Sequence, residues 1–291
     1  MNVLVTGASG RVGLSIALKL LRSHVVRGVD TTPSSSAEFV GDIRDEALMR
    51  QALAGTDVLV HTAALHAPQV GLRPDAEFES INVLATEALA GLALEAGVRH
   101  LVFTSTTALY GHASTPPGRA GWIDESVTPR PRTIYHRSKI EAESRLEAFS
   151  KETGLPVTVL QMSRCFPEPV NLMAVYRLNR GVDFRDVADA HACAIEKRLP
   201  GFQRFIVSAA TPFEPGDCEA LFVDAPGVLR RRAPELVRAF EERGWDLPPS
   251  LDRVYSSALA REALDWAPRH GFQSVLDLYD QELPEVLPPS R

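Results

Sequence analysis

Cysteine, lysine and long apolar runs are all scarce in this chain. Its 291 residues include three widely spaced cysteines, Cys165, Cys193 and Cys218, with no C-x-x-C pair among them. This pattern excludes a disulfide framework and a cysteine-based zinc site, and it is typical of a reduced cytoplasmic protein. No apolar stretch approaches the roughly 20 residues that span a bilayer. Met1 runs directly into an apolar segment, so no signal peptide is expected.

Positive charge is also limited, and nearly all of it is arginine. The chain has four lysines against 27 arginines, and its formal net charge is −6. Such a balance does not favour binding to nucleic acid or to an anionic membrane surface. The 45% hydrophobic and 23% charged residues are those of an ordinary soluble globular protein. We therefore expect a small-molecule partner, with no nucleic acid and no membrane.

Apolar segments with strand and helix periodicity alternate through the first half of the chain, which favours a parallel sheet with right-handed crossovers. We expect a Rossmann-type, doubly wound α/β fold with a smaller, irregular C-terminal lobe. The NAD-binding domain would cover residues 1–163, rejoined by 182–208, and the substrate lobe mainly 164–291, with one amphipathic helix over 230–245. Strands are predicted at 3–6, 24–29, 39–40, 57–61, 100–105 and 157–161, and helices at 14–21, 47–53, 81–96 and 135–151.

A glycine-rich turn, TGASGRVG, follows the first predicted strand. Gly7 permits a tight turn, Gly10 lets the backbone approach a pyrophosphate, and Gly13 lets the helix pack closely on the strand. Asp30 lies 17 residues after Gly13, at the end of the second strand. A carboxylate there accepts the adenosine ribose hydroxyls and repels a 2′-phosphate, and the following TTPSSS contains no arginine. The pattern predicts NAD rather than NADP.

The segment YHRSK places Tyr135 and Lys139 one turn apart on a predicted helix. A tyrosine that acts as a base near neutral pH must lower its pKa by about three units, or roughly 4 kcal/mol. A neighbouring ammonium group and the positive charge of oxidised nicotinamide both favour the phenolate. The spacing therefore predicts Tyr135 as the catalytic acid/base and Lys139 as the residue that tunes it.

Hydroxyl groups gather in TSTTALYG, at the carboxyl end of a predicted strand. Thr106 or Ser105 is expected to hydrogen-bond a substrate oxygen and stabilise the charge that develops on it. His66, in a loop near the expected nicotinamide, is a further substrate contact, whereas His61 is expected to be a structural strand residue. No metal site is predicted from the histidine spacing.

Taken together, these motifs resemble the extended short-chain dehydrogenase/reductase family, the NAD-dependent epimerase/dehydratase group, over almost the whole chain. The matching segments are TGASGRVG, GDIRD, HTAA, INVLATEAL, YHRSK, DFRDVADA and AREALDWAP. Two positions depart from the family pattern: Gln161 stands where an arginine is common, and Asp265 replaces a glycine near the C-terminus. CFPEP with RGVDFRDVADAHA also resembles sugar-acid dehydrogenases of the group.

The resemblance implies an NAD-dependent oxidoreductase or epimerase that acts on a secondary alcohol or keto group of a sugar or sugar derivative. It implies Thr106 in the catalytic serine/threonine position, and a homodimer formed by helices 81–96 and 135–151. The implied cofactor contacts, beyond the catalytic pair, are Gly7, Ser9, Gly10, Arg11, Val12, Gly13, Asp30, Asp42, Ile43, Thr62, Ala63, Ala64, Asn82, Thr104 and Ser105.

Arginines are frequent around and after the catalytic motif, and their planar fork suits carboxylates and phosphates. Arg164 and Arg185 are the foremost candidates to bind an anionic group on the substrate.

Two other functions stay open: a reductase of a non-sugar carbonyl of steroid or phenylpropanoid type, and a non-catalytic NAD(P)-sensing protein. The sequence does not decide between dehydrogenase, epimerase and dehydratase outcomes.

Overall fold

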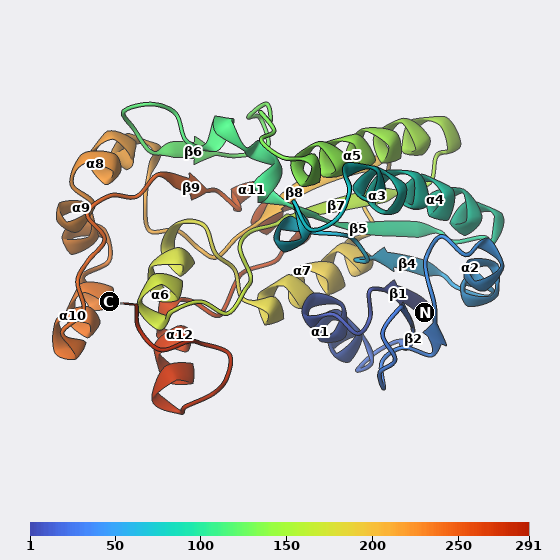
Figure 1. Ribbon diagram of the computed structural model, residues 1–291, viewed down its shortest axis with the longest axis horizontal. Coiled ribbons are helices and arrows are strands. Elements are labelled where there is room, and N and C mark those ends of the chain that lie inside the picture. The colour runs from blue at the N-terminus through green and yellow to red at the C-terminus, as the bar shows by residue number, and fades with distance from the viewer. Residues whose placement is uncertain (291) are drawn as a thin grey trace. The chain divides into compact units, whose positions relative to one another are not determined.

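The computed structural model describes residues 1–290 and divides the chain into two compact units (Figure 1). Unit 1 comprises Met1–Leu109, Pro131–Gln161 and Val187–Phe205, and unit 2 comprises Tyr110–Arg130, Met162–Asp186 and residues from Ile206 onward. The expected division at 163 differs from this one mainly at residues 110–130, which belong to unit 2.

A seven-stranded sheet, in the order β3-β2-β1-β4-β5-β7-β8 within the described residues, is the frame of unit 1. Its first five strands pair in parallel. The strand order reverses beside β1, and in sheets of this kind ligands bind outside the carboxyl ends of the strands at that point. The predicted α/β doubly wound fold is confirmed. The strands are β1 (Asn2–Thr6), β2 (Val25–Asp30), β3 (Phe39–Val40), β4 (Val58–His61), β5 (His100–Thr106), β7 (Val157–Met162) and β8 (Phe202–Val207).

Helices cover both faces of this sheet (Figure 1). On one face lie α1 (Arg11–Leu20) and α7 (Phe184–Lys197), and on the other lie α2 (Glu46–Leu53), α4 (Ala85–Glu95) and α5 (Ile134–Thr153). Leu89, Phe103 and Leu146 are among the buried side chains that pack between the sheet and the second set of helices. A sheet buried on both faces explains why its strands are continuous apolar runs.

The helix predicted over 81–96 begins earlier and is not regular. It consists of α3 (Asp75–Phe78), a π-helical segment (Glu79–Leu84) and α4. The π-helical turns shift the apolar periodicity, which is why the first part was not recognised as helix. Segments of this type are frequent at functional sites, and Asn82 lies in this one.

Unit 2 is mostly helical and has its own apolar core, which includes Met173, Leu221, Phe240 and Leu276. Its short parallel sheet pairs β6 (Gly121–Ile123) with β9 (Arg253–Tyr255). Its helices are α6 (Val170–Asn179), α8 (Cys218–Val223), α9 (Ala225–Arg232), α10 (Pro234–Arg243), α11 (Ala258–Leu264) and α12 (Phe272–Asp280), with short 3₁₀ turns at His112–Ser114 and Pro215–Asp217. Two further 3₁₀ turns lie in unit 1, at Ala67–Gln69, and across the boundary of the two units in the sequence, at Thr107–Tyr110.

The prediction of a single amphipathic helix over 230–245 is wrong. The chain forms two helices there, because α9 ends at Arg232 and α10 begins at Pro234. Ala233 between them has φ −141° and ψ 55°, outside the helical region. Proline lacks the N–H group that would continue the first helix, but it is well suited to the first turn of the second.

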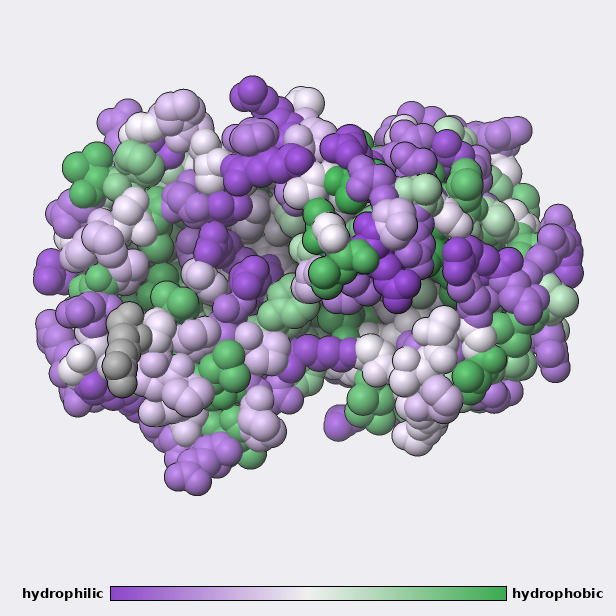
Figure 2. Space-filling model, viewed as in Figure 1, coloured by the Kyte–Doolittle hydropathy of each residue, from purple (hydrophilic) through white to green (hydrophobic). Residues whose placement is uncertain are grey.

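The surface seen in Figure 2 mixes hydrophilic and hydrophobic residues over both units. Among residues 1–290, no helix combines the length and the apolar character that crossing a bilayer requires. Single exposed apolar side chains, such as Leu18 and Val223, are ordinary on protein surfaces.

Gly13→Ala should destabilise the protein. A Cβ at position 13 would lie 2.0 Å from the carbonyl oxygen of Gly7, which is backbone and cannot move aside cheaply. We expect a loss of about 1–3 kcal/mol in the free energy of unfolding, measured by urea denaturation. Gly91→Ala is the matched control, because Gly91 also lies within a helix and a Cβ there meets nothing within 4 Å. The control should raise the free energy of unfolding by up to about 1 kcal/mol. Equal urea midpoints for Gly13→Ala and Gly91→Ala would contradict the packing argument.

Candidate active site

The glycine-rich turn joins β1 to α1 and leaves no room for a side chain at Gly7 or Gly13. Gly7 has a φ of +71°, and a Cβ on it would lie 2.6 Å from Thr62 Oγ1 and 2.8 Å from the amide nitrogen of Ala63. Gly10 is the N-cap of α1 and provides no side-chain hydrogen bond to the first turn. The amide groups of that turn, at Arg11, Val12 and Gly13, lie at the positive end of a helix dipole, which suits a phosphate.

Asp30 ends β2 and faces the same turn. Its Oδ2 accepts a hydrogen bond from the Ser9 amide at 2.9 Å, and its Oδ1 accepts one from the Thr32 amide at 2.8 Å. A carboxylate has about four acceptor positions, so two remain for ribose hydroxyls. The loop that follows is also bonded to the glycine-rich turn, because Ser9 Oγ contacts Ser34 Oγ at 2.7 Å and Ser36 Oγ donates to the Ala8 carbonyl at 2.7 Å.

The structure brings Tyr135, Lys139 and Thr106 together. Tyr135 lies in the first turn of α5, is 9% exposed, and is hydrogen-bonded to the Thr106 side chain at the end of β5. Lys139 follows one turn later and is 2% exposed. Its Nζ donates to the Thr104 carbonyl at 2.8 Å and lies 3.8 Å from the centroid of the Phe103 ring. Helix α5 thus presents the phenol and the ammonium group to the carboxyl end of β5.

The electrostatics of this group differ from the sequence-based expectation. Burial raises the pKa of Tyr135 to about 12, and the hydrogen bond with Thr106 opposes this only in part. Burial also lowers the pKa of Lys139 to about 7, against the charge of Glu143, which raises it. Because desolvation penalises both charged forms, the protein's own groups leave Tyr135 protonated at neutral pH. Lys139 alone does not acidify the phenol.

The hydroxyls before Thr106 are bonded within the protein. Thr104 Oγ1 lies 2.8 Å from His191 Nε2 on α7, whereas Ser105 Oγ donates to Glu143 on α5. Successive side chains of a strand point to opposite faces, which explains the two directions. The contacts of Thr104 and Ser105 with cofactor or substrate stay predictions. Glu143 was missed by the sequence analysis, although its position one turn after Lys139 was a usable signal.

Asn82, predicted as a cofactor contact, connects three parts of unit 1. Its Oδ1 accepts from the Leu65 amide at 2.8 Å, and its Nδ2 donates to the Leu65 carbonyl at 2.8 Å and to Ser138 Oγ at 3.0 Å. Ser138 Oγ in turn donates to the Tyr135 carbonyl at 3.0 Å. The side chain of Asn82 therefore holds the loop after β4 against the first turn of α5, next to the tyrosine.

The other predicted residues of unit 1 lie at or near the loops that leave the strands. Thr62, Ala63 and Ala64 follow β4, and Thr62 Oγ1 donates to the Thr6 carbonyl at 2.6 Å. After β3, Asp42 is paired with Arg44, whose guanidinium holds the pKa of that carboxyl below its usual range. Ile43 is buried in the core, and exposed His66 is the N-cap of a 3₁₀ turn.

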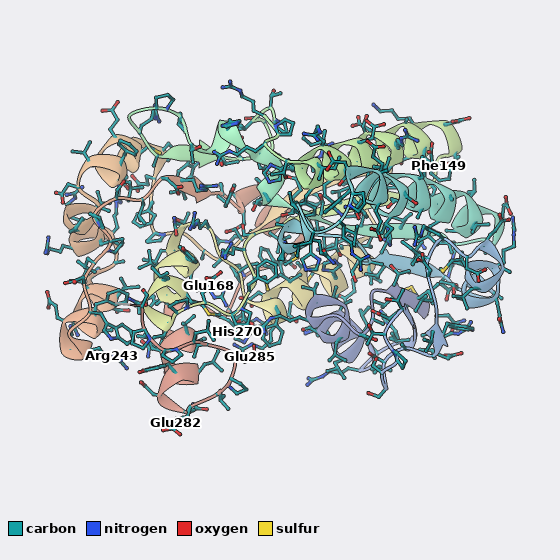
Figure 3. The ribbon with its side chains drawn as sticks, viewed as in Figure 1. Phe149, Glu168, Arg243, His270, Glu282 and Glu285 are labelled. Carbon is teal, nitrogen blue, oxygen red and sulfur yellow. The ribbon has the colours of Figure 1, made fainter. Side chains whose placement is uncertain are left out.

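The two arginines predicted to bind an anion have carboxylate partners within unit 2. Arg164 is paired with Glu168 (labelled in Figure 3). Arg185 holds both oxygens of buried Asp183, with Nε–Oδ1 and NH2–Oδ2 distances of 2.8 and 3.1 Å. Asp183 also pairs with buried Arg177, at 3.2 Å from its NH2, so Arg185 shares this carboxylate with a second arginine. The contact of Arg164 and Arg185 with a substrate anion stays a prediction.

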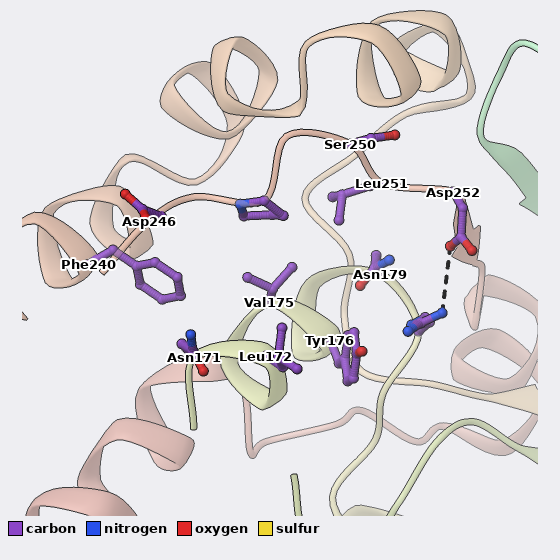
Figure 4. Close-up of a pocket in the computed structure, with 12 residues that line it drawn as sticks. Asn171, Leu172, Val175, Tyr176, Asn179, Phe240, Asp246, Ser250, Leu251 and Asp252 are labelled. Atoms are coloured by element: carbon purple, nitrogen blue, oxygen red, sulfur yellow. Dashed lines mark ion pairs between the residues drawn. The ribbon is translucent and has the colours of Figure 1, made fainter. Parts of the chain in front are cut away.

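Unit 2 contains a cavity of about 330 Å³ between α6 and the segment 246–252 (Figure 4). Tyr176, Phe240 and Leu251 form part of its apolar wall. Arg180, the only cationic residue among the twelve drawn in Figure 4, lies 3.7 Å from an oxygen of Asp252 and over the ring of Tyr176. The volume is at the lower end for small-molecule sites, and the lining does not favour an anion.

Comparison with known proteins decides the classification. Residues 3–169 match the family model described as the NAD dependent epimerase/dehydratase family. The chain belongs to this family. The match confirms the resemblance drawn from the glycine-rich turn and the Y-x-x-x-K motif.

Relatives in the family include two 4-epimerases. The chain is 31% identical over 172 residues to N-acetyl-alpha-D-glucosaminyl-diphospho-ditrans,octacis-undecaprenol 4-epimerase of Escherichia coli O157:H7, a match that covers 57% of this chain and only 50% of that relative. It is 26% identical to UDP-glucose 4-epimerase of Rhizobium meliloti (strain 1021), over 95% of both chains. A solved short-chain dehydrogenase/reductase superfamily protein of Agrobacterium tumefaciens has a TM-score of 0.72 at 18% identity, over 97% of this chain and 100% of that one.

Three buried histidines should make the protein sensitive to acid. Burial lowers the pKa of His61 to about 3 and the pKa values of His100 and His191 to about 4. The folded state keeps these rings neutral, so their stability contribution is complete above pH 6.5 and is lost as the pH falls toward 4. At pH 5 each ring should make the free energy of unfolding about 2 kcal/mol lower than at pH 7, because the unfolded chain binds a proton that the folded state does not. Urea midpoints measured between pH 7 and 5 test this.

His191→Gln removes one of these rings, and its stability should therefore depend less steeply on pH than that of the wild type. His112→Gln, at an exposed position, leaves the three buried rings in place and is the control. Identical slopes for His191→Gln and the wild type would contradict the assignment.

Proposed function

We propose that the protein is an NAD-dependent oxidoreductase or epimerase that moves a hydride to or from a secondary alcohol or keto group of a sugar or sugar derivative. The observation that carries this proposal is the hydrogen bond between Tyr135 and Thr106, with Lys139 buried one helical turn away. A protein that only binds a nucleotide has no need to bring a phenol, an ammonium group and a hydroxyl together.

NAD is the proposed cofactor. The family description names it, and the Agrobacterium tumefaciens protein of similar fold was solved with NAD bound. The residues of this chain fit such a group, because there is no room for a side chain at Gly7 or Gly13, the first amides of α1 lie at the positive end of its dipole, and Asp30 faces the turn. When bound, NAD supplies the hydride acceptor or donor.

The roles of the three residues follow from their protonation. Thr106 holds the substrate oxygen, and Tyr135, neutral because its pKa is raised to about 12, is ready to give a proton to that oxygen as a ketone is reduced. In the oxidation direction Tyr135 must take the proton instead, which requires positive charge beyond that of Lys139. Lys139 holds the end of β5 through the Thr104 carbonyl.

A sugar or sugar derivative is the proposed substrate class. Both 4-epimerases named above take sugar substrates by their names, and the Rhizobium meliloti enzyme matches nearly the full chain. Because Arg164 and Arg185 are paired with carboxylates, the proposal does not include an anionic group bound by them. The homodimer and the cytoplasmic location stay predictions.

Tyr135→Phe should abolish turnover while leaving NAD affinity within a few-fold of the wild type. The substrate is first found by screening aldoses, uronates, nucleotide sugars and a steroid alcohol for NADH formation at 340 nm and, because an epimerase forms no net NADH, for epimer formation by chromatography. NAD affinity is measured by calorimetry. We expect a loss of at least about 100-fold in kcat, since the general acid/base is removed.

Tyr279→Phe, a tyrosine of unit 2 packed against Trp245, is the matched control and should keep full activity. Unchanged turnover in Tyr135→Phe would refute the assignment of the acid/base. A wild type that binds NAD and turns over none of the compounds would favour the NAD-sensing alternative, and turnover of the steroid alone would favour the non-sugar reductase.

A further inference from the structure

A buried carboxylate lies one turn beyond Lys139 on α5. The Glu143 side chain is 4% exposed, yet it receives hydrogen bonds from three neighbouring strands. Ser105 Oγ on β5 donates to Oε1, Gln161 Nε2 on β7 donates to both oxygens at 3.0 and 2.9 Å, and Arg204 Nε on β8 donates to Oε2 at 2.8 Å. All four acceptor positions of the carboxylate are thus in use.

Stability alone does not explain this arrangement. A buried ion pair is often no more stabilising than apolar side chains of similar volume, and Glu143 has apolar neighbours on its own helix at Ala142 and Leu146. Its positive partner Arg204 is only partly buried, at 33% exposure, and also lies 3.7 Å from Glu147. The negative charge is therefore more buried than the arginine that balances it.

The group that this negative charge acts on is Lys139. The ammonium faces the Thr104 carbonyl and the Phe103 ring on β5, Tyr135 and Glu143 on its own helix, and on β4 His61, whose pKa of about 3 keeps that ring neutral. Of these groups, Glu143 is the one that brings a full negative charge. It raises the pKa of Lys139 against burial, which otherwise lowers it.

Glu143 also fixes the strand end that carries the catalytic hydroxyl. Ser105, which donates to Glu143, is the residue immediately before Thr106. The backbone of the preceding residue, Thr104, accepts the hydrogen bond from Lys139. One carboxylate is thus connected both to the residue beside Thr106 and, through its charge, to the ammonium group.

We propose that Glu143 is a positioning residue for the proposed reaction: its buried carboxylate holds the end of β5 through Ser105 and favours the ammonium form of Lys139, so that Thr106 and Tyr135 stay in hydrogen-bond contact. This inference rests on the proposed function for its catalytic meaning, whereas the effect on Lys139 can be tested without any substrate. In this proposal, the guanidinium of Arg204 partly compensates the negative charge of Glu143.

The direct test is a titration of Lys139 by NMR in protein labelled with ¹³C at lysine Cε. The chain has only four lysines, Lys19, Lys139, Lys151 and Lys197, so the signals are few and Lys139→Met identifies its own. In the wild type Lys139 should titrate near pH 7. Glu143→Gln should lower that midpoint by about one pH unit, a tenfold change in the acid constant. An unchanged midpoint would overturn the proposal.

Two variants serve as controls of the titration. Glu147→Gln removes a more exposed carboxylate that lies one turn further along α5 and is paired with Lys151 and Arg204; it should leave the Lys139 midpoint unchanged. If Glu143→Gln fails to fold, Arg204→Gln provides the test with opposite sign. Removing the balancing cation should raise the Lys139 midpoint, and a fall would overturn the proposal.

The kinetic test uses the pH profile of kcat/KM. In Glu143→Gln the loss of activity at alkaline pH should begin about one pH unit lower than in the wild type, and Glu143→Asp should restore it in part. A uniform loss at every pH would show a merely structural role and overturn the proposal. A wild type without turnover would refute the proposed function alone, because the NMR titration would still report on Glu143.

Discussion

Lys139 carries its charge in an interior from which water is excluded, and the geometry around it follows from that constraint. The Thr104 carbonyl, the Phe103 ring and the charge of Glu143 offset the desolvation of the ammonium group. The first two, which belong to β5, require α5 to pack closely over that strand. The same packing places Tyr135, one turn earlier, against Thr106 and among the apolar side chains Leu65 and Phe78.

Much of this arrangement was accessible from the sequence. The 39–40 strand was predicted with its observed bounds, and the strands that carry Asp30 and Thr106 were placed to within a residue or so. Local spacing was sufficient there because strands buried on both faces are short apolar runs between turn residues. The i, i+4 pair of Tyr135 and Lys139 was also correctly placed on one face of a helix.

Other features depend on contacts between distant segments, and periodicity does not report these. The π-helical turns around Asn82 bring its amide to Leu65 and Ser138, which lie 17 and 56 residues away. The raised pKa of Tyr135 reflects burial that the sequence does not show. In unit 2 the sequence did not show that Arg164 is paired with Glu168, or that Arg185 and Arg177 share the carboxylate of Asp183.

The serine-rich loop after β2 has a consequence for cofactor engineering. Ser34 and Ser36 bond it to the glycine-rich turn, and a Cβ at Gly28 would lie only 1.8 Å from the Ser36 carbonyl oxygen, so the loop lies directly on the strand. Replacing Asp30 alone would remove the carboxylate that repels a 2′-phosphate, but the loop would still be packed directly on β2. A switch to a 2′-phosphorylated dinucleotide would require the whole segment from Thr31 to Ser36 to be rebuilt, with a cation introduced in place of its hydroxyls.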